Sequence, residues 1–264
     1  MLMEAKKEFK FIFLSIKYNI AREMTNKATF LTNVIFMILN NSAFIVEWLV
    51  FFSLKSDIGG YGFKDVLLLW SLASGSYAIC FIFFGAVQNL PNLIMDGKID
   101  SFLVQPKNVL ISILSSKTKV SAIGDLIYSY ILFFVYGFTI KNFLLFNLFI
   151  ITGGIIIVAI AVIFSSLAFY ITKANTITDN IMGAMINFNT YPDGIFKDFV
   201  RLLFYTIIPV SFAVYMPLNI LRNFDLIKFL VVISYTLIIT IIAFLSFYKG
   251  LKRYSSGNLM SSRI

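Results

Sequence analysis

The sequence predicts an all-α integral membrane protein with six transmembrane helices, an N-terminal interfacial amphipathic helix and a re-entrant outer hairpin before the last helix. Of the 264 residues, 59% are hydrophobic and only 13% are charged, with a mean hydropathy of +0.88. A soluble domain has about a quarter of its residues charged. Long apolar segments alternate with short stretches where Lys and Arg gather, and about 20 apolar residues cross the hydrocarbon. We expect residues 1–264 to form a single transmembrane domain.

Composition also argues against other classes of protein. The chain has no histidine, and its single cysteine, Cys80, lies in an apolar run. We therefore expect no metal site and no catalytic residue, because the usual proton shuttle and the commonest metal ligand are missing. The net charge of +9 follows from Lys and Arg at segment ends, where membrane topology places them. We expect membrane lipid and no nucleic acid as a partner.

Residues 1–27 predict the interfacial helix. Ile12, Ile16 and Ile20 recur at helical spacing, and Lys10 and Lys17 lie on other faces. Such a helix rests in the membrane surface with its lysines toward anionic headgroups. A solvated tail is the alternative. The segment has no short apolar core with a small-residue cleavage site, so we expect no cleaved signal peptide.

Six segments are long or apolar enough to be transmembrane helices in this interpretation. They are residues 28–54, 65–87, 121–140, 143–171, 174–191 and 226–248. Between the third and the fourth, Lys141 and Asn142 leave room only for a tight turn. The fifth segment is the least apolar of the six.

Two of these segments carry polar stripes. Asn33, Asn40 and Glu47 are seven residues apart in the first, and Asn180 and Asn187 are seven apart in the fifth. Seven residues are close to two helical turns, so each series shares one face. Polar groups within a bilayer face protein or water. The stripes predict either a polar cleft with a transport role or hydrogen bonds that only pack helices together.

The stretch at residues 88–118 is neither a span nor a plain loop. From Ile99 its pattern predicts a short helix that Pro106 ends or kinks. The expected apolar side holds Ile99, Phe102 and Leu103, and the polar side holds Asp100, Ser101 and Gln105. A short amphipathic element between spans rests on the bilayer or docks into a groove of a partner. An ordinary surface helix is the alternative.

The stretch at residues 192–223 predicts the outer hairpin. Residues 193–208 are too few to cross a bilayer at about 1.5 Å each. Pro209 breaks the run, which then continues to Pro217. A broken, half-length apolar piece is typical of a re-entrant segment buried against protein.

The positive charges predict the orientation. With the N-terminus inside and six spans, most Lys and Arg residues fall in the inner segments. Cytoplasmic segments carry the excess of Lys and Arg. We therefore expect a multi-pass protein of the cell (plasma) membrane with both termini in the cytoplasm, the 88–118 loop inside and the hairpin outside.

The order of these features resembles the permease subunit of a type-2 ABC transporter, of the exporter class. The motifs that carry the resemblance are Met95-Asp96-Gly97-Lys98-Ile99-Asp100 with Leu103 and Pro106, Gly124-Asp125-Leu126, Tyr191-Pro192 with Ile195-Phe196, Ile208-Pro209-Val210, and Tyr215-Met216-Pro217. Gln105 departs from the pattern, which has a basic residue before the proline. The resemblance covers nearly the whole chain.

The resemblance implies the membrane subunit of an ATP-driven exporter. Two permease chains, identical or sister, would pair with two ABC ATPase subunits that bind ATP and Mg²⁺. The polar stripes would then line a cleft at the interface of the two permease chains, through which substrate passes. The expected coupling residues are Gly97, Asp100, Leu103 and Pro106, and the expected residues of the outer hairpin are Tyr191, Pro192, Pro209, Tyr215 and Pro217. The chain itself lacks the G-x-x-x-x-G-K-[ST] phosphate loop, so ATP hydrolysis belongs to a partner and this chain needs no cofactor of its own.

Other classes of function remain open from the sequence. Glu47, Asp125 and Asp179 within the spans suit an ion-gradient-driven secondary transporter or channel subunit, although no inverted repeat is evident. A subunit that assembles without transporting is another possibility. An enzyme has little support, since no acid–base constellation is present. The substrate, whether a drug, a peptide, a lipid or a sugar polymer, is not given.

Overall fold

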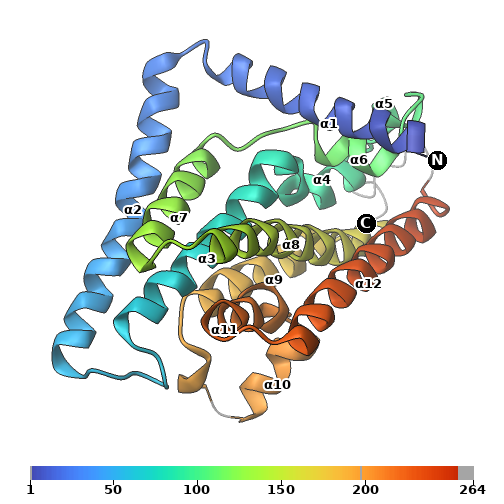
Figure 1. The fold of residues 1–264 in the computed structure, drawn as a ribbon. Coiled ribbons are helices and arrows are strands. Elements are labelled where there is room, and N and C mark those ends of the chain that lie inside the picture. Colours follow the sequence, from blue (N-terminus) through green and yellow to red (C-terminus); the bar gives the residue numbers. More distant parts are fainter. Residues whose placement is uncertain (1, 197, 255–264) are drawn as a thin grey trace.

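The computed structural model describes residues 2–196 and 198–254, and in this part of the chain helices joined by short connections make up the fold (Figure 1). The longer helices are α1 (Leu2–Glu23), α2 (Lys27–Leu54), α3 (Phe63–Phe83), α7 (Ser121–Tyr136), α8 (Ile140–Ser165), α9 (Ala174–Asn189) and α12 (Leu226–Leu251). The shorter helices are η1 (Gly85–Asn89), α4 (Leu90–Met95), α5 (Asp100–Leu103), α6 (Val109–Leu114), η2 (Ser166–Phe169), η3 (Asp193–Ile195), α10 (Asp198–Thr206), η4 (Ser211–Tyr215) and α11 (Met216–Arg222).

Helix α3 is the centre of the bundle, because it packs on both α7 and α8 and most of its side chains are buried. Small residues allow this close approach. Gly75 lies directly against Ser129 and Ile150, where a Cβ would collide. Ser71 and Ser129 each donate a hydroxyl hydrogen bond to the other's carbonyl, at 2.7 and 2.6 Å. Buried hydroxyls are thus satisfied across the α3–α7 contact, as a helix pair without water requires.

Helix α1 follows the amphipathic pattern. Ile16 is buried, Ile12 and Ile20 pack against the core, and Lys10 and Lys17 are exposed. The helix lies across one end of the bundle, near α4, α5 and α6 (Figure 1). We call this end the α1 end, and the opposite one the α10 end. The place of α1 in a membrane surface stays a prediction.

Four helices are long and apolar enough to cross a membrane: α2, α3, α8 extended by η2, and α12. The pair of α10 with η4 and α11 would make a fifth, although it is bent by 80°. Helix α7 has only 16 residues, or about 24 Å of rise, against a hydrocarbon core of about 30 Å. Helix α9 also has 16 residues and carries more polar side chains. The structure therefore supports four or five spans among the described residues, and the count of six stays a prediction.

The turn between α7 and α8 lies earlier than the sequence predicted. Gly137 has φ of +144°, which reverses the chain, and the Thr139 hydroxyl accepts a hydrogen bond from the Asn142 N–H at 3.2 Å to cap α8. Lys141 and Asn142 are therefore in the first turn of the helix. The prediction that these two residues form the turn is wrong, because a glycine and a capping threonine begin the helix three residues earlier.

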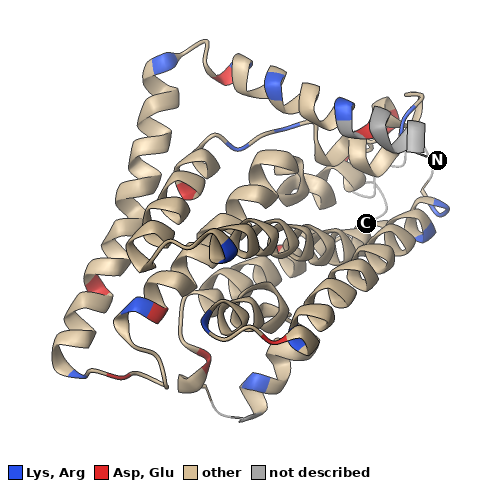
Figure 2. Ribbon diagram, in the orientation of Figure 1, with Lys and Arg blue, Asp and Glu red and all other residues tan. Residues whose placement is uncertain are grey.

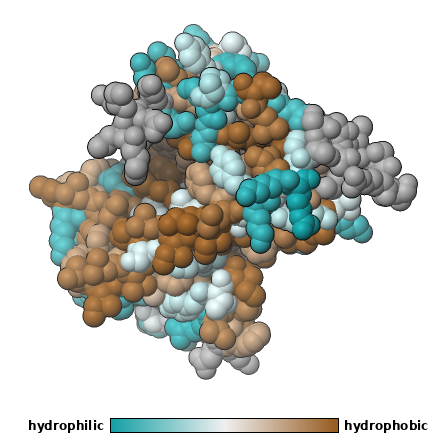
Figure 3. All heavy atoms as spheres, turned by 90° about the vertical axis from the view of Figure 1, so that its right-hand side faces the viewer, coloured by the Kyte–Doolittle hydropathy of each residue, from teal (hydrophilic) through white to brown (hydrophobic). Residues whose placement is uncertain are grey.

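Charge and hydropathy are distributed as a membrane protein requires. Charged residues gather in α1 and at the two ends of the bundle (Figure 2). Hydrophobic residues cover much of the middle of the face shown in Figure 3. Apolar side chains of α2 and α12 account for many of the exposed large hydrophobic residues, among them Phe36, Leu39, Leu237 and Ile241. This surface suits contact with lipid or with another apolar helix.

Candidate functional site

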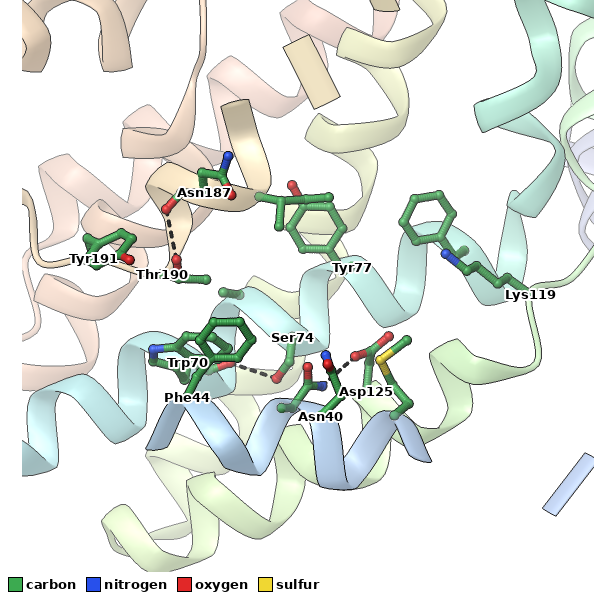
Figure 4. A pocket seen from close by; sticks show the side chains of 15 residues that line it. Asn40, Phe44, Trp70, Ser74, Tyr77, Lys119, Asp125, Asn187, Thr190 and Tyr191 are labelled. Carbon is green, nitrogen blue, oxygen red and sulfur yellow. Dashed lines mark hydrogen bonds between the residues drawn. The ribbon is translucent and has the colours of Figure 1, made fainter. Parts of the chain in front are cut away.

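A cavity of about 340 Å³ lies between α2, α3, α7 and α9 (Figure 4). Polar and aromatic side chains line it together. The polar group comprises Asn40, Asn41, Ser74, Lys119, Asp125, Asn187 and Thr190, and the aromatic group comprises Phe44, Trp70, Tyr77, Phe81 and Tyr191. A cavity of this size and mixed lining is typical of a small-molecule site.

The cavity brings the two predicted stripes together at one point. Asn40 of α2 and Asn187 of α9 both line it. Asn33, Glu47 and Asn180 are not among the lining residues. All five side chains are exposed on this chain, so neither stripe is buried inside its core.

Asn41 and Asp125 form the polar centre of the cavity wall. The Asn41 Nδ2 donates to the Asp125 Oδ1 at 2.6 Å, and the Tyr128 hydroxyl donates to the Asn41 carbonyl at 3.0 Å. The helices can approach closely because Gly124 lies against the Val34 backbone, where a Cβ would collide. Sequence reasoning had placed Asn41 in the first span without a role. Its neighbour Asn40 is exposed while Asn41 is buried, a difference of one helical step.

Stacked rings form the apolar part of the lining. Phe44 and Trp70 stack with ring centroids 5.0 Å apart, and Tyr77 and Phe81 stack at 6.1 Å. The Lys119 Nζ lies 5.0 Å from the centroid of the Phe81 ring, a cation–π contact that keeps the ammonium group at the cavity. The cavity therefore offers ring faces, amide groups and both signs of charge to a bound molecule.

The predicted coupling loop is at the α1 end. Its helix, α5, comprises only Asp100–Leu103 and ends before Pro106. Ile99 is fully buried, so it anchors the loop and does not belong to an exposed apolar side. Leu103 and Val104 are instead the exposed apolar residues, at 39% and 84%. The apolar side that the sequence predicts comprises Ile99, Phe102 and Leu103 and does not include Val104.

Helix α1 holds the far side of this loop. The Asn108 N–H donates to the Glu8 Oε1 at 3.2 Å, and the Lys107 Nζ lies 3.9 Å from the centroid of the Phe11 ring. Pro106 is exposed and lies with these residues at a surface hollow. The two amphipathic elements that the sequence predicted separately are therefore in contact.

At the α10 end, the predicted hairpin residues stabilise one bend. The Tyr215 hydroxyl is 2.6 Å from the Phe188 carbonyl and 3.0 Å from the Tyr191 carbonyl. The Tyr215 hydroxyl thus caps one carbonyl in the last turn of α9, which has no partner four residues on, and one just beyond the helix. Pro192, Pro209 and Pro217 are buried, and Tyr191 is exposed. Re-entry of the bend into a membrane stays a prediction.

A direct contact joins the hairpin to the turn before α3. Gly194 lies against the Gly59 backbone so closely that a Cβ has no room. The Tyr61 hydroxyl donates to the Asp193 Oδ1 at 2.7 Å. Arg222 then pairs with Asp65 at 3.1 Å. The α10 end is thus held by backbone contact and by polar groups together.

The described residues include no group of three or more His, Cys, Asp or Glu side chains placed to hold a metal ion. The chain matches the family described as ABC-2 family transporter protein over residues 38–257. This range contains the loop with α5, the hairpin and all of the cavity lining except Met37. Comparisons with curated proteins and with solved structures gave no match.

Proposed function

Because the chain belongs to the ABC-2 transporter family, we propose that this membrane subunit works in an ATP-driven exporter as one of two permease chains coupled to two separate ATPase subunits. The ATPase subunits bind ATP and Mg²⁺. The subunit crosses the plasma membrane with the α1 end in the cytoplasm. The basic residues of α1, of the 88–118 loop and of the end of α12 support this orientation.

The exposed edge of the α5 loop carries the proposal. Leu103 and Val104 are exposed at the α1 end, on a short loop that the buried Ile99 and the contacts of α1 with Lys107 and Asn108 anchor. Two adjacent exposed apolar side chains on a held loop suit insertion into a hydrophobic groove of a partner. ATP-driven closure of the ATPase pair would press on this edge, and the transmembrane helices would rearrange.

The cavity supports a pathway at the interface between two permease chains. Asn33, Asn40, Glu47, Asn180 and Asn187 are exposed, although they lie on helices that would contact the bilayer. Lipid satisfies no polar group, so a second chain or a water-filled cleft would have to cover both stripes. Substrate would enter near Asn40 and Asn187, where the stripes meet.

An ion-gradient-driven carrier has weaker support. It would need acidic groups that gather along one path. Asp125 lines the cavity and accepts a hydrogen bond from Asn41, whereas Glu47 and Asp179 are not among the lining residues. No observation favours this function over the family assignment.

Crosslinking tests the proposal. In the assembled complex, we expect Leu103→Cys to crosslink to an ATPase subunit and Leu144→Cys, an exposed leucine at the outer end of α8, not to do so. Leu103→Asp should insert normally, yet it should abolish the ATP-dependent change in maleimide labelling of Ile186→Cys in the cavity. This readout needs no substrate. Absence of any crosslink from Leu103→Cys would refute the coupling role.

Labelling from each side of the membrane tests the orientation. We expect Lys98→Cys and Lys252→Cys to react only from the cytoplasm and Lys55→Cys only from outside. All three positions are exposed, and the native Cys80 is buried, so background labelling should be low. The opposite pattern would remove the coupling role, because the loop would face away from ATP.

A further inference from the structure

The α5 loop cannot hold its own shape. Helix α5 has only four residues, and a single helical turn is unstable in isolation. Gly97 precedes it with φ of +71°, a conformation that reverses the chain and that glycine adopts without strain. The position of Leu103 and Val104 therefore depends on contacts from outside the loop.

Two of these contacts have been described above. Ile99 is fully buried in the core, and α1 holds Lys107 and Asn108 on the far side. Between these two points lies Asp100, the first residue of α5. Asp100 lies on the same short turn as Leu103, so a contact to its carboxylate bears on how that turn is oriented.

Tyr254 supplies a third contact, from the other end of the chain. Its hydroxyl donates to the Asp100 Oδ1 at 2.6 Å, across 154 residues of sequence. Gly97 lies beside the same hydroxyl, and a Cβ there would be 3.5 Å from the oxygen. Burial and the bond to Asp100 raise the pKa of Tyr254 above its usual value, so the hydroxyl keeps its proton at neutral pH. A donor that is always protonated facing a carboxylate makes a strong, charge-assisted hydrogen bond.

Tyr254 is itself fixed to two transmembrane helices. It follows α12 directly, and its N–H donates to the Leu251 carbonyl at 3.1 Å. Its ring meets Phe169, at the end of the helix formed by α8 and η2, edge-on with centroids 6.2 Å apart. Phe169 in turn packs on Phe247 of α12, at 5.6 Å, and against Gly250. Phe169 and Phe247 are both buried.

We infer that Tyr254 is a positioning residue that holds the α5 loop to the ends of α8 and α12 through its hydrogen bond to Asp100. The inference rests on the proposed coupling function of the loop. A push on Leu103 and Val104 then moves α8 and α12 directly, because the loop does not rotate about Ile99. Without the hydroxyl, the same push rotates the loop, and the resulting movement of α8 and α12 is smaller.

Tyr254→Phe tests this in the assembled complex with its ATPase subunits, because it keeps the ring on Phe169 and removes only the hydroxyl. We expect ATP hydrolysis to stay within about twofold of wild type, whereas the ATP-dependent change in maleimide labelling of Ile186→Cys falls about threefold to tenfold. Tyr170→Phe is the matched control. Tyr170 lies at the same end, its ring contacts Arg253, and among the described residues its hydroxyl has no hydrogen-bond partner, so we expect no change.

A double-mutant cycle shows whether the two residues act through one bond. Asp100→Ala should reduce the labelling change as Tyr254→Phe does. The double variant should show no smaller labelling change than the more impaired of the two single variants. Asp100→Asn keeps an acceptor oxygen and should stay closer to wild type than Asp100→Ala. The comparison of Asp100→Asn with Asp100→Ala also tests the inference if Tyr254→Phe fails to assemble.

The inference is overturned if Tyr254→Phe behaves as wild type, if the two effects add, or if Asp100→Asn is as impaired as Asp100→Ala. Crosslinking separates these failures from failure of the proposed function. If Leu103→Cys still reaches the ATPase subunit, only the role of Tyr254 is wrong. If it never does so, the coupling role itself is wrong and the inference falls with it.

Discussion

Adjacent asparagines on α2 should behave oppositely when each is replaced by leucine. Asn41 is buried and its Nδ2 donates to the Asp125 carboxylate at 2.6 Å. Asn41→Leu leaves that partly buried carboxylate without this donor, at a cost of about 2 to 3 kcal/mol. Asn40 is exposed at the cavity, and Asn40→Leu should change the free energy of unfolding by no more than about 0.5 kcal/mol.

Thermal unfolding of the purified subunit measures the difference. For a chain of this size, about 2 to 4 °C corresponds to 1 kcal/mol, so Asn41→Leu should lower the apparent Tm by about 4 to 12 °C. Asn40→Leu should change it by less than about 2 °C. Asn41→Leu combined with Asp125→Leu removes both partners and should recover most of the loss, because no unpaired charge remains.

The result also decides between the two interpretations of the polar stripes. If Asn40→Leu or Asn187→Leu lowers the Tm as much as Asn41→Leu does, the stripes pack helices and form no pathway. If both leave the Tm unchanged and alter the ATP-dependent labelling of the cavity, the pathway interpretation holds. An Asn41→Leu variant as stable as wild type would refute the reasoning about the buried pair.

Three further substitutions, with Gly183→Ala as a control, test the α10 end. Gly194→Ala should lower the apparent Tm by at least about 4 °C, because its Cβ would collide with the Gly59 backbone. Gly183→Ala has open space around it and should be neutral or slightly stabilising in its helix. Tyr215→Phe should cost about 1 kcal/mol, seen as a Tm shift of about 2 to 4 °C, because the Phe188 and Tyr191 carbonyls lose a donor. Arg222→Gln should cost about 1 kcal/mol or less and should matter less in high salt, because its pair with Asp65 is partly exposed.

Features that depend on local sequence could be predicted well. Long apolar runs require helices, and α2, α3, α8 and α12 appear close to their predicted bounds. The amphipathic period of residues 1–27 gave α1, and Pro209 gave the bend at the hairpin. These predictions succeeded because each rests on the period of a helix or on the geometry of one residue.

The site could be predicted only in part. The seven-residue spacing found both polar stripes, and the structure joins them at Asn40 and Asn187. The same spacing could not show that Asn41 faces Asp125, because that depends on how closely α7 approaches α2 at Gly124. For the α5 loop, an idealised helix placed Ile99 on the apolar side that was expected to dock or to rest on the bilayer, whereas packing buries Ile99 in the core of this chain and leaves Val104 exposed.

The sequence by itself determined the class of protein, the helices and the motifs that carry the family resemblance, because composition and periodicity are properties of the chain alone. Only the tertiary structure decided which polar residues share a cavity, and that Tyr254 meets Asp100 across 154 residues. Contacts between distant segments depend on the packing of whole helices against one another. Small residues such as Gly75 and Gly124 set those distances, and their effect is visible only when both partners are in place.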